Sequence, residues 1–215
     1  QQREQSKDNI IAINKGLSRF DKETKSSHLP NKVEEAQANT ANITKVLVLS
    51  HMFPHPDQPG SGPFIHEQVR SLMKHNEVEG RVISCRPFWV NTLNPFKVFR
   101  ALRAYFKHLK SVTWKSWEGV TCMYPGYLVG KYCPFWLHAT TYRYTIKKLL
   151  NSVYRDFNFN IVHAHTGYLD GQAGAFIKKK YNIPLVITEH TGPLSHITTP
   201  RVVGIQTKNS YLSAN

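Results

Sequence analysis

Short, almost wholly apolar runs recur along this chain, and segments with helical spacing separate them. Strands are expected at residues 46–49, 79–85, 120–124, 160–165 and 184–188, with a short sixth at 201–205. Strands without polar alternation are typical of a parallel sheet that is buried on both faces. Helices are expected from about residues 64–75, 96–110, 142–154 and 173–181. The alternation predicts an α/β domain, a Rossmann-like parallel sheet flanked by helices.

The first 44 residues have a different composition. They are rich in Gln, Asn, Lys, Ser and Glu, and their only apolar run is at residues 10–13. Such a segment cannot bury enough apolar surface to offset the entropy lost on ordering. We therefore expect residues 1–44 to form a disordered extension and residues 45–215 to form one domain. A chain of 215 residues is too short for two full α/β domains.

The positive charge belongs to the expected domain. The net charge is +14, from 28 Lys and Arg and 14 Asp and Glu, and residues 1–44 hold only seven of the former and six of the latter. The remainder therefore carries 21 − 8, or +13. Such an excess points to an acidic partner, namely a nucleic acid, an anionic lipid or a phosphorylated substrate.

One helical segment combines this charge with aromatic residues. Phe96, Phe99, Leu102, Phe106 and Leu109 form an apolar stripe. The preferred interpretation is a core-facing helix with a solvated basic side, and the second is a helix that lies on an anionic membrane surface. Nucleic acid is a third interpretation, but no known nucleic-acid module is present, and we expect no such partner. The cations beside the stripe are Lys97, Arg100, Arg103, Lys107 and Lys110.

Cysteine usage indicates the compartment. Cys85, Cys122 and Cys133 form no C-x-x-C pair, and an odd, sparse set favours reduced thiols and a cytoplasmic location. No apolar run approaches the ~18 residues of a membrane span. If the basic helix binds lipid, the chain would be peripheral on the inner face of the membrane.

Three polar motifs follow predicted strands. They are the glycine-rich loop around Gly60 and Gly62, the pair His163 and His165, and the segment that ends at His190. Ligands of parallel sheets bind beyond the carboxyl ends of the strands, so these motifs are expected to meet at one edge of the sheet.

Each motif also has a structural explanation. The glycine loop precedes a helix, whose free amides favour phosphate, but a tight turn explains it at least as often. His163 and His165 share one strand face, yet Asp170 is the only nearby carboxylate, so we expect no metal site. His190 can exchange a proton near neutral pH or orient a sugar hydroxyl, although a lone histidine is more often structural.

Together these motifs resemble the N-terminal domain of retaining glycosyltransferases of the GT-B fold, specifically glycosyltransferase family 4. The resemblance covers about residues 45–195 and not residues 1–44. It is carried by residues 46–50 with 53–54, by 60–69, by 161–165 with 169–171, and by 184–192.

The resemblance implies transfer of a sugar, with retention, from a nucleotide sugar to a glycan or lipid-linked acceptor, as in polysaccharide biosynthesis. It implies no metal and no cofactor besides the donor substrate. The implied roles are catalysis for His190, a loop near the donor diphosphate for Gly60, Ser61 and Gly62, and the acceptor side for His165, Tyr168, Asp170 and Glu189.

The family's second domain, which binds most of the donor and carries a pair of glutamates, has no counterpart in this sequence. We expect it to be supplied in cis or in trans, and the chain alone not to turn over. Residues 196–215 are expected to be a compressed closing strand and turn, or a truncated gene end. Two alternatives remain: a non-catalytic module of this fold that binds an anionic ligand or a membrane surface, and, with less support, a nucleotide-sugar epimerase.

Overall fold

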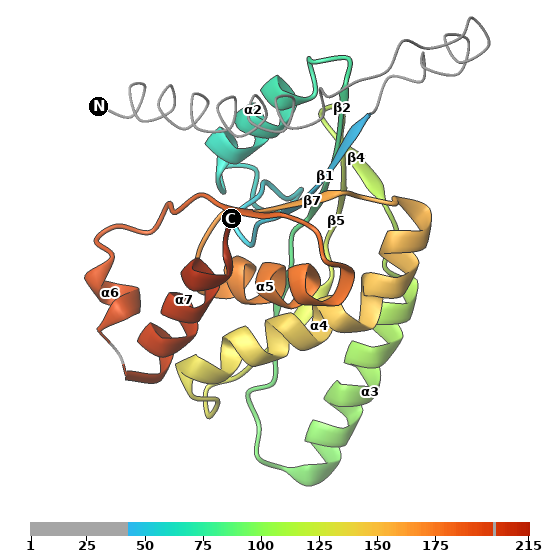
Figure 1. Cartoon of the computed structure of the whole chain (residues 1–215). Helices are drawn as coiled ribbons and strands as arrows, with labels where there is room; N and C mark the ends of the chain where they lie inside the picture. Colours follow the sequence, from blue (N-terminus) through green and yellow to red (C-terminus); the bar gives the residue numbers. More distant parts are fainter. Residues whose placement is uncertain (1–42, 200) are drawn as a thin grey trace, which may run out of the picture. The chain divides into compact units, whose positions relative to one another are not determined.

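The computed structural model describes residues 43–199 and 201–215, so the extension predicted for residues 1–44 lies almost entirely outside the described residues. The described chain folds around a six-stranded sheet of order β4-β5-β2-β1-β7-β8 (Figure 1). All neighbouring strands are parallel except β4 and β5. The predicted Rossmann-like class is confirmed. The strands are β1 (Thr44–Leu49), β2 (Val78–Ile83), β4 (Lys115–Trp117), β5 (Val120–Met123), β7 (Ile161–Ala164) and β8 (Leu185–Ile187).

Helices connect the parallel strands and cover the sheet. They are α2 (Pro63–Leu72), α3 (Pro95–Ser111), α4 (Phe135–Asp156), α5 (Leu169–Tyr181), α6 (Ser195–Thr198) and α7 (Arg201–Ser213). Two further strands, β3 (Arg86–Trp89) and β6 (Gly126–Val129), pair in parallel as a separate small sheet. No helix within the described ranges has the length and apolarity needed to span a bilayer.

Both faces of the central strand β1 are buried, which explains its unbroken apolar sequence. Val46 and Val48 belong to one apolar cluster, which includes Ile65 and Val69 of α2. Leu47 and Leu49 belong to a larger cluster with side chains of α4 and α5. Since successive strand residues point to opposite faces, helices on each side require an apolar residue at every position.

The C-terminal segment differs from its prediction. Residues 201–205 begin α7 and do not form a sixth strand. Val203, Thr207 and Ser210 are buried at helical spacing, and the Thr207 hydroxyl donates to the Ile197 carbonyl at 3.3 Å. A Cβ atom on Gly204 would lie 2.1 Å from the Thr198 carbonyl oxygen, so α6 and α7 approach closely. Packing has thus overridden the strand preference of the β-branched residues.

The apolar stripe predicted along α3 is buried only in part, at Leu109 and the half-buried Leu102. Tyr105 and Leu109 are buried, whereas Phe96, Phe99 and Phe106 are 84%, 70% and 42% exposed. The cations from Lys97 to Lys110 are exposed as well. The preferred interpretation, a core-facing stripe with a separate basic side, is therefore wrong for the phenylalanines, because a helical turn of 3.6 residues places them among the cations.

Candidate functional site

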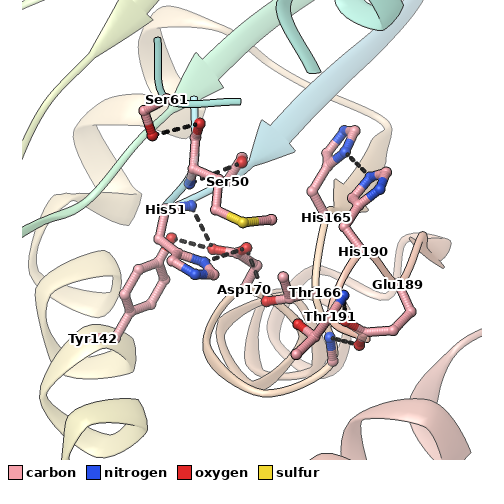
Figure 2. A network of polar contacts seen from close by, with 12 residues as sticks. Ser50, His51, Ser61, Tyr142, His165, Thr166, Asp170, Glu189, His190 and Thr191 are labelled. Carbon is pink, nitrogen blue, oxygen red and sulfur yellow. Dashed lines mark hydrogen bonds and ion pairs between the residues drawn. The ribbon is translucent and has the colours of Figure 1, made fainter. Parts of the chain in front are cut away.

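Three strand ends place polar side chains at one edge of the sheet. Leu49 of β1 lies level with Ile83 of β2 and with Ala164 of β7, which in turn lies level with Ile187 of β8. The strand order reverses at β1, since β2 lies on one side of it and β7 on the other. In open parallel sheets, ligands bind beyond such a reversal. Figure 2 shows the side chains that gather there.

A buried carboxylate on α5 fixes the segment that follows β1. Asp170 is fully buried, and its Oδ1 accepts hydrogen bonds from the His51 amide at 3.1 Å and the Tyr142 hydroxyl at 2.6 Å. Its Oδ2 lies 3.0 Å from Nδ1 of His51 and accepts a bond from the Thr166 hydroxyl, also at 3.0 Å (Figure 2). Because Asp170 is fully buried and both its oxygens are hydrogen-bonded to the protein, it is suited to position His51.

His51 is the histidine of this edge whose surroundings stabilise the cationic form. Burial acts to lower the pKa of His51, but the charge of Asp170 and the hydrogen bond to it outweigh burial, so this pKa is raised above its ordinary value. The side chain keeps 28% of its surface exposed. A protonated, partly open imidazole at a strand end is suited to offset the charge of a phosphate.

A second histidine pair joins β7, β8 and α2. Nδ1 of His165 lies 3.0 Å from Nε2 of His190 (Figure 2), and the two rings stack with centroids 5.2 Å apart at an angle of 8°. Phe64, in the first turn of α2, packs against His190 with ring centroids 4.8 Å apart. The start of the helix that follows the glycine loop therefore meets the end of β8.

These two histidines favour the neutral form. Burial lowers the pKa of His165 well below its ordinary value, and the neighbouring His163 and His190 lower it further. Burial also lowers the pKa of His190, against the smaller opposing effects of Glu189 and Asp170. Since Nε2 of His190 is paired with His165, its other nitrogen, Nδ1, is the one suited to hydrogen-bond a ligand hydroxyl.

Glu189 is held in place by three hydrogen bonds. Its carboxylate accepts from the amides of Gly167 at 2.8 Å and Thr191 at 2.7 Å, and from the Tyr211 hydroxyl on α7. Burial acts to raise the pKa of Glu189, but the hydrogen bonds, that from Tyr211 first, outweigh it and lower the pKa. Glu189 is therefore an ionised group that ties the end of β8 to α7.

The glycine loop contains one position that only glycine can fill. Gly62 caps α2 with a φ of 55°, and a Cβ atom there would lie 2.0 Å from the Met52 carbonyl oxygen. The Ser61 hydroxyl donates to the same carbonyl at 3.1 Å. A Cβ atom on Gly60 would meet nothing within 4 Å. A tight turn thus accounts for Gly62, and the turn directs the start of α2 to His190.

The structure separates the predicted site residues into three groups. His165, Glu189 and His190 lie together at the sheet edge, beside the helix that Gly60, Ser61 and Gly62 introduce. Tyr168 is buried in the core, and its hydroxyl donates to the Phe135 carbonyl, so Tyr168 and Asp170 offer no free polar atom. Their acceptor-side role stays a prediction. Their contacts favour a role in positioning neighbouring residues. The third group, on α3 away from the strand ends, is Lys97, Arg100, Arg103, Lys107 and Lys110.

Three residues of this edge have no assigned role in the sequence prediction. His51 directly follows a predicted strand, and that position was a usable signal. The sequence around Tyr142 predicts only a core position of a helix. Tyr211 lies in the segment that was predicted to be a strand and turn. In the described part of the chain, no group of three His, Cys, Asp or Glu side chains could hold a metal ion.

Comparison with known proteins points to one family. Residues 115–211 match the family model described as Glycosyltransferase Family 4, which is slightly less than half of the 215-residue chain. The predicted resemblance to this family is confirmed by the match, which contains His165 and His190. No curated protein matches the chain. Among solved structures, a UDP-GlcNAc 2-epimerase from Neisseria meningitidis bound to UDP-GlcNAc is 13% identical with a TM-score of 0.43, over 80% of this chain and 39% of that chain.

Proposed function

We propose that this chain supplies the acceptor-side domain of a retaining glycosyltransferase that moves a sugar from a nucleotide donor to a glycan or lipid-linked acceptor. The observation that carries this assignment is the meeting of His190 with His165 and with Phe64 at the start of α2, beside the edge where Asp170 holds His51. The family match over residues 115–211 supports the reaction class.

Each group at the edge has a task in such a transfer. His190, as a neutral imidazole, orients a hydroxyl of the transferred sugar. His51, as an imidazolium, faces the leaving diphosphate. Asp170 keeps His51 protonated, and Glu189 fixes the segment that carries His190. The remaining contacts with the donor come from a second domain, in cis or in trans.

Nuclear magnetic resonance of the histidine side chains tests this function without turnover. UDP-, GDP- and dTDP-sugars, added separately to the chain, should shift the imidazole signals of His51 and His190. The signals of His75 and His196, which are exposed on other segments, should stay unchanged. If no nucleotide sugar moves the His51 and His190 signals at millimolar concentration, this domain is not part of the donor site.

One observation favours the alternative, a non-catalytic module that binds an anionic membrane surface. The exposed phenylalanines of α3 are interleaved with cations, which a purely structural helix does not require. A module of this kind would bind anionic vesicles and leave the histidine signals unmoved by every nucleotide sugar. The two functions therefore give opposite results in the same titration.

A further inference from the structure

We propose that α3, the end of β3 and the start of α4 form a docking face for an anionic phospholipid bilayer, with a pocket that admits one hydrocarbon chain of a lipid. This docking makes the membrane partner named above specific and rests on it, but it does not depend on glycosyl transfer. The docking face is defined by Trp89, Leu93, Phe96, Phe99, Tyr132 and Trp136, which are 42% to 84% exposed.

One apolar pocket adjoins this docking face. The pocket has a volume of about 280 Å³, and Leu93 and Tyr132 line it directly. Trp89 precedes the lining residue Val90, and Phe96 and Phe99 lie on the same helix as the lining residue Val98. Contiguous exposed apolar surface of this kind marks an interaction site on a protein surface.

The chemistry of the pocket selects a hydrocarbon. Its other lining side chains include Leu102, Leu128 and Leu137. The backbone at its wall is already paired, since the Val90 amide donates to the Val129 carbonyl at 2.8 Å and the Leu128 carbonyl accepts from Thr141 at 2.7 Å. A polar ligand would leave its own hydrogen-bonding groups unpaired there, whereas an acyl chain has no such groups. The volume lies at the lower end for ligand pockets and suits part of a single chain.

Charge identifies the source of that hydrocarbon as an anionic membrane. Glu118 is the only acidic residue between Arg86 and Arg155. The exposed cations of α3 lie among Phe96, Phe99 and Phe106, so aromatic insertion and attraction to lipid phosphates act on one helix face. Nucleic acid would satisfy the cations but would leave the apolar pocket and its exposed rim in water.

Vesicle co-sedimentation tests the docking face. The full chain should bind vesicles of phosphatidylcholine with about a third phosphatidylglycerol at least about tenfold more tightly than vesicles of phosphatidylcholine alone. Phe96→Ser with Phe99→Ser should weaken binding by about tenfold or more. The matched control, Ile205→Ser with Leu212→Ser, removes exposed apolar residues from α7 and should bind as the native chain does.

Bromine quenching tests the pocket separately. A brominated fatty acid, kept below its critical micelle concentration, should quench tryptophan emission and saturate at one molecule per chain. Trp89→Phe with Trp136→Phe should abolish most of the quenching, since Trp114 and Trp117 lie outside the docking face. Quenching without saturation, or none, would overturn the pocket assignment.

Two vesicle results would overturn the docking face. One is equal binding by the Phe96 and Phe99 double variant and the native chain. The other is binding to single-stranded RNA with no binding to anionic vesicles, which would identify a nucleic-acid surface instead. Either result leaves the glycosyltransferase assignment intact, because the histidine titration with nucleotide sugars contains no lipid.

Discussion

At the sheet edge, histidines of the same intrinsic chemistry have pKa values shifted in opposite directions because their immediate neighbours differ. His51 faces the carboxylate of Asp170, whereas His163 has the Thr188 hydroxyl at 2.8 Å and the His165 ring at a centroid distance of 4.2 Å. A carboxylate favours the imidazolium, and a buried site beside another imidazole disfavours it. One edge thus offers a cation and neutral donors side by side.

His190→Ala should reduce sugar transfer by about a hundredfold, because the variant loses the group that we propose orients the reacting sugar. The assay uses the chain together with the proposed donor-binding domain. His196→Ala, at an exposed position on α6, is the matched control and should retain full activity. Unfolding curves should show both variants folded, and native turnover in His190→Ala would remove this residue from the site.

The pH dependence of stability should report His163. Burial, with the charge of His190, lowers the pKa of His163 to about 4, whereas an unfolded histidine titrates near 6.5. Since the folded value is the lower one, the unfolded chain binds the proton first, and the free energy of unfolding should fall as the pH drops from about 6.5 to 4. The contribution of His163 is about 3 kcal/mol.

Urea unfolding across that pH range measures the effect. His163→Gln keeps a polar partner for Thr188 but does not titrate. Its free energy of unfolding should therefore fall less steeply with decreasing pH, and the fall that remains should be due to His165. His51 does not mask the result. Because its pKa is raised in the folded chain, its contribution to the free energy of unfolding is lost only as the pH rises above about 6.5. An unchanged slope in His163→Gln, matching that of the exposed control His75→Gln, would contradict the assignment.

At the scale of elements, α2 depends on a single backbone conformation at its start. Gly62→Ala should cost about 2 kcal/mol or more, because the new methyl group would meet the Met52 carbonyl and the φ is positive. Gly60→Ala, two residues away in open space, should change stability by no more than about 0.5 kcal/mol. Denaturation midpoints of the two variants give the comparison, and equal midpoints would contradict it.

The docking of α7 should depend on the Tyr211 hydroxyl. Tyr211→Phe removes one hydrogen bond to a half-buried carboxylate and should lower the free energy of unfolding by about 1 to 2 kcal/mol. The pKa of Glu189 should rise, because its most important hydrogen-bond donor is lost. Tyr132→Phe, at an exposed tyrosine, is the control, and a Tyr211→Phe protein as stable as this control would show that the contact contributes little.

Elements with an apolar run or a regular helical spacing could be predicted, and those without one could not. β1, β7 and β8 lie in mainly apolar runs with turn residues after them, and α2 and α3 have clear helical spacing. β3, β4 and β6 begin with Arg86, Lys115 and Gly126, so they lack such a run although they are no shorter than β8. The segment of α7 has the composition of a strand, and its helical form depends on contacts with α5 and α6 that local sequence does not encode.

The site follows the same division. The rule that ligands bind beyond strand ends was sufficient to place His165 beside His190, because it depends only on topology. It could not identify Asp170 as the partner of His51, since that contact joins residues 119 positions apart and depends on the position of α5. Nor could it separate the phenylalanines of α3 from its core, because their apolar character is the same in either place.

For the whole molecule, all strands of the described sheet lie within residues 43–215. The Thr44 amide, at the start of β1, already donates to the Glu77 carbonyl at 2.7 Å. Removal of residues 1–42 should therefore leave the free energy of unfolding within about 0.5 kcal/mol of the native value, as the composition of that segment predicts. Parallel denaturation of the full and shortened chains tests this, and a large loss of stability would show that the first 42 residues belong to the folded domain.

α4 contributes residues both to the apolar pocket and to the sheet edge. Its Leu137 lines the apolar pocket. Tyr142, five residues after Leu137 and about 7.5 Å further along the helix axis, donates a hydrogen bond to Asp170. Thr141, between them, holds the wall of the pocket through the Leu128 carbonyl. A rigid helix cannot move at one of these points without moving at the other. If the proposed lipid chain and the proposed donor phosphate both bind, a displacement of α4 by the lipid chain would reach His51 through Tyr142 and Asp170. The two affinities would then be thermodynamically linked, each altering the other by the same factor.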